Sequence, residues 1–436
     1  MLHIDEATEQ ELVAMQVELE NSYQSLKKAN LKLDLTRGKP NTDQLALSSD
    51  LDGILDGDYR GEDGTDLQNY GGLDGITEAK LLFSQILDVS TENTLIGGNS
   101  SLTLMFQLVD HALNYGIDDN CLNAWKNEGQ VKFICPVPGY DRHFSVCEYL
   151  GIKMIPVTVD DNGPDMNQVE SLLKSDPLIK GIWCVPRFSN PTGIVYSTET
   201  VRRIAQLGNI AGPNFRVIWD NAYAVHSLYD NAPELLSIAE CTREYGTEDS
   251  VYLIGSTSKI TFASAGVAFV GSSRSNLDSF NKHLSIQTIG PDKINQRRHV
   301  LFLKDMANLK AHMQKHANIL RPRFETVIAL LEHNLAGSGM GQWSEPKGGY
   351  FISFDSLSGL AKEIVAMAGG IGVKLTPAGA TFPKGEDPKD SNIRLAPSFD
   401  SVTNIELAIQ AFIICVKLAS VRQRLASEAG ISKNAG

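Results

Sequence analysis

A lysine and an aspartate each follow directly on an apolar run, and their side chains are the first candidates for chemistry. Lys259 closes the segment Ser-Thr-Ser-Lys after the run Val251–Ile254, and Asp220 follows the run Arg216–Trp219. A lysine held out of water at the mouth of a sheet has a lowered pKa, and its neutral amine attacks carbonyl carbon. Taken alone, Lys259 is more typical of a solvated surface residue, and Asp220 of a helix N-cap or a turn.

A third polar segment completes a series in which each member follows an apolar strand candidate. Asn190 stands in the turn Asn-Pro-Thr-Gly after the run Gly181–Val185, and Tyr223 comes three residues after Asp220. Asn-Pro followed closely by Gly is common turn chemistry, so this turn alone indicates only a loop. The order of the three segments is more informative than any one of them.

The order Asn-Pro-Thr-Gly, Asp-x-x-Tyr and Ser-x-Ser-Lys resembles the fold type I enzymes of the aspartate aminotransferase superfamily, which use pyridoxal 5′-phosphate (PLP). The matching residues are Asn190, Asp220, Tyr223, Ser256, Ser258 and Lys259. The resemblance implies that Lys259 forms the Schiff base with the cofactor. Asp220 would keep the pyridine nitrogen protonated, so that the ring draws electrons from the substrate α-carbon. Asn190 and Tyr223 would hydrogen-bond the phenolic oxygen of the cofactor.

The cofactor phosphate needs a binding site of its own, and a glycine before a helical stretch is a candidate. Gly98, Asn99 and Ser100 open the stretch that runs to Tyr115, where free backbone N–H groups and the helix dipole attract anions. Simple N-capping is the alternative interpretation, and the two are compatible with each other. The family usually has an arginine soon after the Schiff-base lysine, but the run Ala263–Phe269 holds no cation. Hydroxyls and backbone amides, or an Arg or Lys from elsewhere, must then balance the phosphate charge.

Further matches to the family surround the ring and the substrate. Tyr140 stands where the family stacks an aromatic ring on the pyridine, and Arg394 matches the arginine whose parallel N–H donors bind the substrate α-carboxylate. Gly38, in Leu-Thr-Arg-Gly-Lys-Pro, would line the substrate pocket together with Asn190, and its segment resembles the bacterial subgroup of 1c aspartate aminotransferases. Tyr70 matches the segment that reaches the cofactor phosphate of a neighbouring subunit, which implies a homodimer with shared active sites.

The resemblance implies a ping-pong transamination between aspartate and 2-oxoglutarate, in which Lys259 also shuttles a proton. A dicarboxylic substrate needs a second cation opposite Arg394. The sequence leaves six possible suppliers: Arg37, Lys39, Arg142, Lys293, Arg297 and Arg298. Alanine or aromatic donors, decarboxylation and lyase reactions remain alternatives on the same fold. A PLP-binding regulator without turnover is a more distant alternative, because it needs a basic DNA-binding domain where this chain has an acidic arm.

The elements that must position these residues alternate between strand and helix, which predicts an α/β domain with a mostly parallel sheet. The strand candidates are Lys132–Cys135, Lys153–Val157, Gly181–Val185, Arg216–Trp219, Val251–Ile254 and Val267–Val270. Long helices are expected from Ile294 to Leu335, and a smaller α+β domain after them. We therefore expect an N-terminal arm and part of the small domain in residues 1–65, a large PLP-binding domain in 66–310 and a C-terminal small domain in 311–436.

Composition narrows the function further. The 436 residues carry 52 acidic against 39 Lys and Arg side chains, a net charge of −13, which disfavours nucleic-acid binding. The N-terminus lacks the order of a secretory signal, and the apolar stretch Ala408–Val416 is too short to span a bilayer, so we expect a core helix there. The six cysteines show no paired metal-ligand spacing. These features predict a cytoplasmic protein with reduced thiols, no metal site and no membrane partner.

Overall fold

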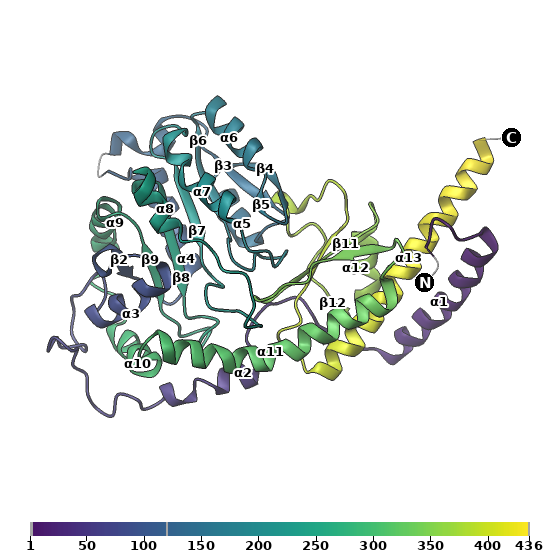
Figure 1. The fold of residues 1–436 in the computed structure, drawn as a ribbon, viewed down its shortest axis with the longest axis horizontal. Helices are drawn as coiled ribbons and strands as arrows, with labels where there is room; N and C mark the ends of the chain where they lie inside the picture. The colour runs from purple at the N-terminus through teal and green to yellow at the C-terminus, as the bar shows by residue number, and fades with distance from the viewer. Residues whose placement is uncertain (1–2, 119–120, 435–436) are drawn as a thin grey trace.

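Within residues 3–118 and 121–434, which the computed structural model describes, a mixed sheet of eight strands forms the centre of the larger part of the molecule (Figure 1). In spatial order the strands are β2 (Thr94–Ile96), β9 (Ala268–Gly271), β8 (Val251–Ser256), β7 (Arg216–Asp220), β6 (Ile179–Cys184), β3 (Lys132–Val137), β4 (Lys153–Asp160) and β5 (Gly163–Pro164). From β8 to β4 all neighbours are parallel, whereas β9 is antiparallel to β2 and β8, and β5 is antiparallel to β4. This is the mostly parallel sheet that the sequence predicts.

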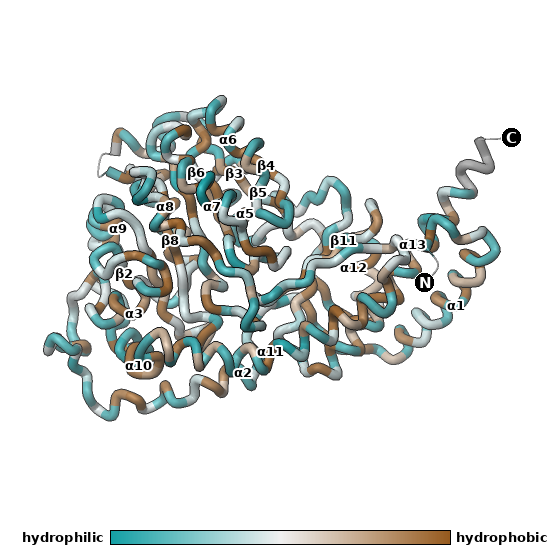
Figure 2. Tube along the Cα trace, viewed as in Figure 1, coloured by the Kyte–Doolittle hydropathy of each residue, from teal (hydrophilic) through white to brown (hydrophobic). Residues whose placement is uncertain are grey.

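Helices cover both faces of this sheet, because its strands are apolar on both sides. In β3 the side chains of Phe133 and Cys135 enter one buried cluster and that of Ile134 enters another, as the alternation of a strand requires. The surrounding helices are α3 (Thr77–Leu87), α4 (Ser101–Asn114), α5 (Asp141–Tyr149), α6 (Met166–Ser175), α7 (Thr198–Ala205), α8 (Ile238–Tyr245), α9 (Arg274–Gln287) and α10 (Lys293–Leu303). Figure 2 shows the hydrophobic residues gathered along the strands between these layers.

The smaller part of the molecule combines the two ends of the chain. Its antiparallel sheet holds β10 (Gly341–Trp343), β11 (Ile352–Ser356) and β13 (Asn392–Leu395), and a parallel pair joins β1 (Leu33–Asp34) to β12 (Val373–Lys374). Its helices are α1 (Glu9–Ala29), α2 (Thr42–Ala46), α11 (Met306–Leu335), α12 (Ala361–Gly370) and α13 (Val402–Asn434). The pairing of β1 with β12 attaches the N-terminal arm to the C-terminal elements.

Helix α11 connects the two parts and runs beneath both of them in Figure 1. Its first residues pack in a cluster of the large sheet, and its later ones, from Ala317 to Leu335, pack in the cluster of the small part. It therefore crosses the boundary predicted at residue 310, and the division into residues 1–65, 66–310 and 311–436 stays a prediction. A residue with positive φ, Lys304, separates α10 from α11 in the stretch expected to hold long helices.

Helix α13 includes a stretch, Val402–Glu428, that is long and apolar enough to cross a membrane. More than half of its most apolar window is buried inside the protein. Residues such as Phe412 and Val416 are fully buried and belong to the cluster of the small part, in keeping with the core helix expected there. Cys135, Cys147, Cys184, Cys241 and Cys415 are buried free thiols, while the side chain of Cys121 lies outside the description.

Candidate active site

The carboxyl ends of neighbouring strands bring the predicted catalytic residues to one edge of the large sheet. Tyr140 follows β3, Asn190 follows β6, Asp220 ends β7 and Lys259 follows β8. These strands are adjacent and parallel, so their carboxyl ends share an edge, and ligands of open α/β sheets bind beyond that edge. Motifs far apart in the sequence therefore lie close together in space.

The Asp220 carboxylate has one oxygen bonded and the other without a partner. Asp220 is 2% exposed, its Oδ2 lies 3.1 Å from Nε2 of His143, and its buried Oδ1 has no hydrogen-bond partner among the described residues. A buried acceptor without a donor is costly. This oxygen fits a donor supplied by a ligand, and the protonated ring nitrogen of PLP is such a donor.

His143, which contacts Asp220 Oδ2, is not predicted from the sequence. It comes from α5, and its ring stacks on Trp183 with 4.3 Å between centroids and 8° between planes. Its position three residues after Tyr140, one helical turn away, was the only available signal. The stacking fixes the imidazole, and the imidazole in turn fixes the Asp220 carboxylate.

The amine of Lys259 lies in surroundings that favour its neutral form. Burial lowers the pKa of Lys259 below that of an ordinary lysine, and the charge of Asp220 opposes this fall without cancelling it. Its Nζ lies 5.0 Å from the ring centroid of Tyr223. A neutral amine is a nucleophile toward carbonyl carbon, so the local environment supports the predicted chemistry.

Two tyrosines near Asp220 keep their hydroxyl protons. Burial first, and then the charges of Asp220 and Asp141, raise the pKa of Tyr140 to about 12. Burial, followed by Tyr140 and Asp220, raises the pKa of Tyr223 well above its usual range. Both hydroxyls are therefore hydrogen-bond donors at neutral pH.

Ser256 and Ser258 join the residues predicted to bind phosphate, which lie at the start of α4. Ser256 Oγ donates to Ser258 Oγ at 3.2 Å, and Ser258 Oγ donates to the carbonyl of Asn99 at 3.3 Å. Ser100 is the N-cap residue of α4, but its side chain does not cap the helix, and a Cβ built on Gly98 would meet nothing within 4 Å. A helix N-terminus next to serine hydroxyls is suited to an anion.

Arg394 already has partners on both parts of the molecule. Its Nη1 lies 3.0 Å from Asp141 Oδ1 and 3.2 Å from Asn190 Oδ1, and its Nη2 lies 3.3 Å from Thr376 Oγ1. Its buried Nε has no partner among the described residues, and the guanidinium lies over the ring of Phe351 at 4.8 Å. One N–H is therefore still available to a carboxylate ligand.

Gly38 reaches the same place from the N-terminal arm. A Cβ at this position would overlap the ring of Phe351, and the guanidinium of Arg394 lies over that same ring. The neighbouring Thr36 accepts a hydrogen bond on its carbonyl from Thr376 Oγ1 at 3.0 Å. Glycine is required here because the backbone packs directly on an aromatic ring.

Tyr70 is not brought to the other site residues of this chain. Its side chain is 82% exposed, and the carbonyls of Asn69, Tyr70 and Gly71 are held by Nζ of Lys293 at 2.7, 3.2 and 2.9 Å. Lys293 is itself only 4% exposed. Lys293 therefore holds the backbone of this loop in place, while the tyrosine ring points away from the chain's own core.

Four of the six candidate cations already contact other groups of this chain and are called committed, and the other two are called uncommitted. Arg297 bonds Glu62 and Glu78, Arg298 bonds Leu51 and Asp52, Lys293 bonds the carbonyls of residues 69–71, and Lys39 lies over the ring of Phe399. Within the described chain, the exposed guanidinium groups of Arg37 and Arg142 have no ion-pair partner. The charge of Arg142 also lowers the pKa of Tyr140 against the other effects, so this arginine lies near the site.

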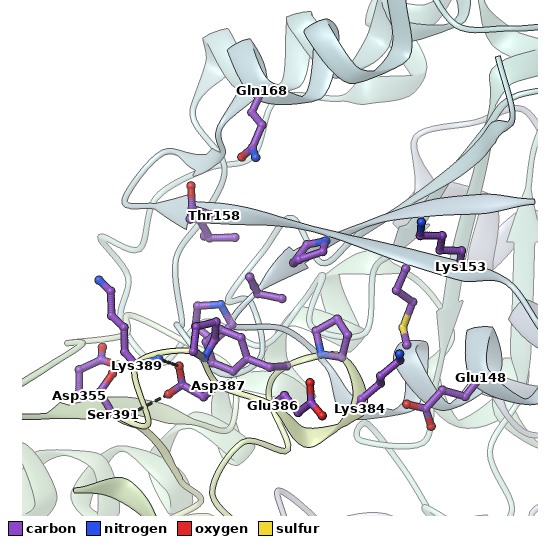
Figure 3. Close-up of a pocket in the computed structure, with 18 of the residues that line it drawn as sticks. Glu148, Lys153, Thr158, Gln168, Asp355, Lys384, Glu386, Asp387, Lys389 and Ser391 are labelled. Atoms are coloured by element: carbon purple, nitrogen blue, oxygen red, sulfur yellow. Dashed lines mark hydrogen bonds between the residues drawn. The ribbon is translucent and has the colours of Figure 1, made fainter. Parts of the chain in front are cut away.

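A wide groove of about 1240 Å³ lies elsewhere, between β4 and the loop before β13 (Figure 3). Its wall carries both charge signs, from residues such as Lys153 and Glu386. Asp387 accepts from the backbone N–H groups of Ser391 at 2.8 Å and of Lys389 at 2.9 Å, which fixes the loop itself. None of the predicted catalytic residues lines this groove, so the candidate site is the strand-end cluster and not this groove.

Comparison with known proteins adds independent evidence. The family model described as aspartate amino-transferase matches residues 7–428. An aspartate aminotransferase of Corynebacterium glutamicum is 43% identical over 404 residues, which are 92% of this chain and 93% of that protein. The crystal structure of an aspartate transaminase from C. glutamicum has a TM-score of 0.93 at 41% identity, covering 97% of this chain and 99% of that one. An α-aminoadipate aminotransferase of Thermus thermophilus, solved with N-(5'-phosphopyridoxyl)-L-leucine, shares the fold with a TM-score of 0.72 at 20% identity, over 89% of this chain and 92% of that one.

Proposed function

The chain belongs to the aspartate aminotransferase family, and on that premise we propose that it transfers the amino group of aspartate to 2-oxoglutarate with PLP as cofactor. The observation that carries the proposal is the half-satisfied carboxylate of Asp220 at the strand ends, close to the amine of Lys259. Aspartate as the donor rests on the names of the C. glutamicum relatives.

The residues gathered at the strand ends fit the parts of PLP. Bound PLP supplies a ring that accepts electrons from the substrate α-carbon. Asp220 would hold a proton on the ring nitrogen, and Tyr140 would lie on the ring. Ser256 and Ser258, with Gly98, Asn99 and Ser100, would hold the phosphate. This arrangement lets hydroxyls and backbone amides do what an arginine after the lysine does in other family members.

The chain's own groups then have separate tasks. Lys259 Nζ would bind the cofactor and later move a proton at the substrate α-carbon, for which a neutral amine is needed. Tyr223 and Asn190 would donate hydrogen bonds toward the phenolic oxygen. The guanidinium of Arg394 would hold the substrate α-carboxylate and so orient the reacting bond.

A second cation must meet the side-chain carboxylate of aspartate. Arg142 is favoured because it is uncommitted and stands two residues after Tyr140 in the candidate site. Arg37 is also uncommitted and stands next to Gly38. The other four candidates already bond to this chain, so removing their charges from those partners would cost stability.

The active unit that we propose is a homodimer in the cytoplasm. The exposed Tyr70 on its fixed loop supports the idea that it completes the phosphate site of a second copy. Ile289 lines a hollow together with the Tyr70 loop and is 62% exposed. Ile286, three residues earlier, is 86% exposed. Contiguous exposed apolar patches mark surfaces that another chain covers, and these two side chains are candidates for such a patch.

Product analysis tests the proposal. The purified protein is incubated with PLP, aspartate and 2-oxoglutarate, and Lys259→Ala serves as the control. Equal amounts of oxaloacetate and glutamate, absent with Lys259→Ala, are expected. Alanine formed from aspartate would indicate decarboxylation. Turnover with other amino acids but not with aspartate would overturn the assignment of aspartate as the amino donor.

A further inference from the structure

Two buried histidines bond to the backbone of the Lys259 segment from outside it. His226 Nε2 lies 3.2 Å from the carbonyl oxygen of Lys259, and His312 Nε2 lies 2.7 Å from that of Ile260. His226 is 4% and His312 is 7% exposed. The turn that carries Lys259 is thus held by one residue of the loop after β7 and one of helix α11.

A third histidine bonds to the next residue of the turn. His299 Nε2 lies 2.8 Å from Oγ1 of Thr261, and its Nδ1 lies 2.8 Å from the carbonyl of Asn295. Because a carbonyl only accepts, Nδ1 carries the hydrogen, and Nε2 of the neutral ring accepts from Thr261. Three consecutive residues, 259 to 261, therefore each bond to a different histidine.

The same logic fixes the ring forms of His226 and His312. Both Nε2 atoms face carbonyl oxygens, so both carry hydrogen. In His226 the buried Nδ1 has no partner among the described residues, which suits an unprotonated nitrogen of a neutral ring. Burial lowers the pKa of His226 to about 3, helped by the charge of Lys259, and burial also lowers the pKa of His312.

The support for His312 continues to the N-terminal arm. His316 Nδ1 accepts from Gln44 Nε2 at 3.0 Å, so His316 Nε2 carries hydrogen and, 3.1 Å from His312 Nε2, turns toward the same carbonyl of Ile260. Gln44 Nε2 also donates to the Tyr350 hydroxyl at 2.8 Å. Gln44 is fully buried in α2. A chain of polar contacts therefore connects the arm and the small part of the molecule to the lysine turn.

The groups around His226 determine whether its imidazole is neutral or charged. The rings of Tyr223 and Tyr350 lie 5.8 Å from its own ring, and the charges of Lys259, His316 and Arg187 act on it. No carboxylate is among these groups. The surroundings therefore favour a neutral imidazole that donates one hydrogen bond.

We propose that His226 and His312 are positioning residues for Lys259, which aim its amine by holding the carbonyls of Lys259 and Ile260. This inference rests on the proposed function of Lys259 and adds residues that act through the backbone of the lysine turn. A lysine whose turn is free to rotate would lose orientation, and orientation errors near 1 Å cost up to about a hundredfold in rate.

Glutamine and asparagine make a matched pair of substitutions at His226 and at His312. The amide nitrogen of glutamine reaches roughly the place of Nε2, whereas that of asparagine reaches only the place of Nδ1. His111, a 2% exposed histidine of α4 whose ring contacts are Phe280 and His283, receives the same two substitutions as a control. Each variant is loaded with PLP, and its visible absorption band is titrated with pH.

His226→Asn and His312→Asn are expected to lower kcat roughly tenfold with KM for aspartate unchanged. The pH midpoint of the visible band should rise, because a loosened lysine becomes better solvated. His226→Gln and His312→Gln should retain kcat and the midpoint. The urea midpoint measures any general loss of stability, which the His111 variants should share without the change in the band.

Identical kcat and band midpoints in the Asn and Gln variants would overturn the positioning role while leaving the proposed function intact. If an Asn variant fails to fold, the Gln variant alone decides, since loss of kcat there despite a normal urea midpoint would also contradict the idea. A wild-type protein that forms no band with PLP would overturn the proposed function, and this inference with it.

Discussion

Nη1 of Arg394 lies 3.0 Å from Oδ1 of Asp141, so the arginine that matches the substrate-binding position is paired with a carboxylate of its own chain. The contact joins β13 of the small part to the first residue of α5 on the large part. The arginine is 8% exposed, and the aspartate side chain is 33% exposed. A substrate carboxylate that bound Arg394 would therefore share or replace this partner.

Asp141→Asn should tighten the binding of carboxylate ligands. Removing the internal anion frees the guanidinium, and a partly exposed pair of this kind is worth up to about 1 kcal/mol, or roughly fivefold in Kd. Calorimetry with succinate measures the change. Asp176→Asn, which removes the partner of Lys132 at 2.6 Å, is the control and should leave Kd unchanged. Weaker binding by Asp141→Asn would show instead that Asp141 holds Arg394 in its binding position.

Asp220→Asn should keep PLP bound at Lys259 but lower kcat by about a hundredfold or more. The amide cannot hold a proton on the ring nitrogen, and a lost electrostatic group of this type costs about 2.7 kcal/mol or more. Steady-state kinetics with aspartate and the visible spectrum measure the two effects separately. Wild-type kcat in this variant would remove Asp220 from the chemistry.

The fold was more predictable than the site. The runs before Asp220 and Lys259 are apolar and short, so strand ends at those residues follow from the sequence alone, and the resemblance to the aspartate aminotransferase family is confirmed. Asp141 and His143 were not predicted because their partners lie across the sheet edge and on another part of the molecule. Their importance comes from tertiary contacts, and no local pattern encodes those.

The buried histidines show the same limit. His226, His299 and His312 come from three separate elements and converge on one turn, although none has a sequence motif around it. The role of Tyr70 stays a prediction, since it concerns a second copy of the chain. Positions at strand ends are thus predictable from the sequence, whereas contacts made through packing are not.

The histidine cluster should make the protein sensitive to acid. Burial lowers the pKa of His226 to about 3 and those of His299 and His316 to about 4, whereas the unfolded chain binds these protons near pH 6.5. The unfolded state therefore binds more protons as pH falls below about 6.5, and the free energy of unfolding decreases until the folded values are reached. Each histidine contributes about 1 kcal/mol per pH unit in this window.

Urea unfolding between pH 7.5 and 4.5 measures this loss. His299→Gln should flatten the dependence on pH, because glutamine does not titrate, whereas the exposed His333→Gln should not change the slope. An equal slope for wild type and His299→Gln would show that this histidine is not held neutral by the fold.

The donor preference should depend on one of the two uncommitted arginines. Arg142→Ala should raise KM for aspartate by about tenfold or more while leaving turnover of alanine unchanged, because only the dicarboxylic substrate uses the second cation. Arg37→Ala is the matched comparison. A selective loss with Arg37→Ala would transfer the role to that residue, and equal losses on both substrates would show that neither arginine selects the donor.

We propose that Lys259 binds PLP and that the bound cofactor takes its amino group from aspartate. The most direct measurement is the visible spectrum of the protein after PLP is added, then aspartate, then 2-oxoglutarate, with Lys259→Ala measured in parallel. A band that forms in the wild type alone, bleaches with aspartate and returns with the keto acid is the predicted result. A wild-type spectrum that equals that of Lys259→Ala at saturating PLP would contradict the account.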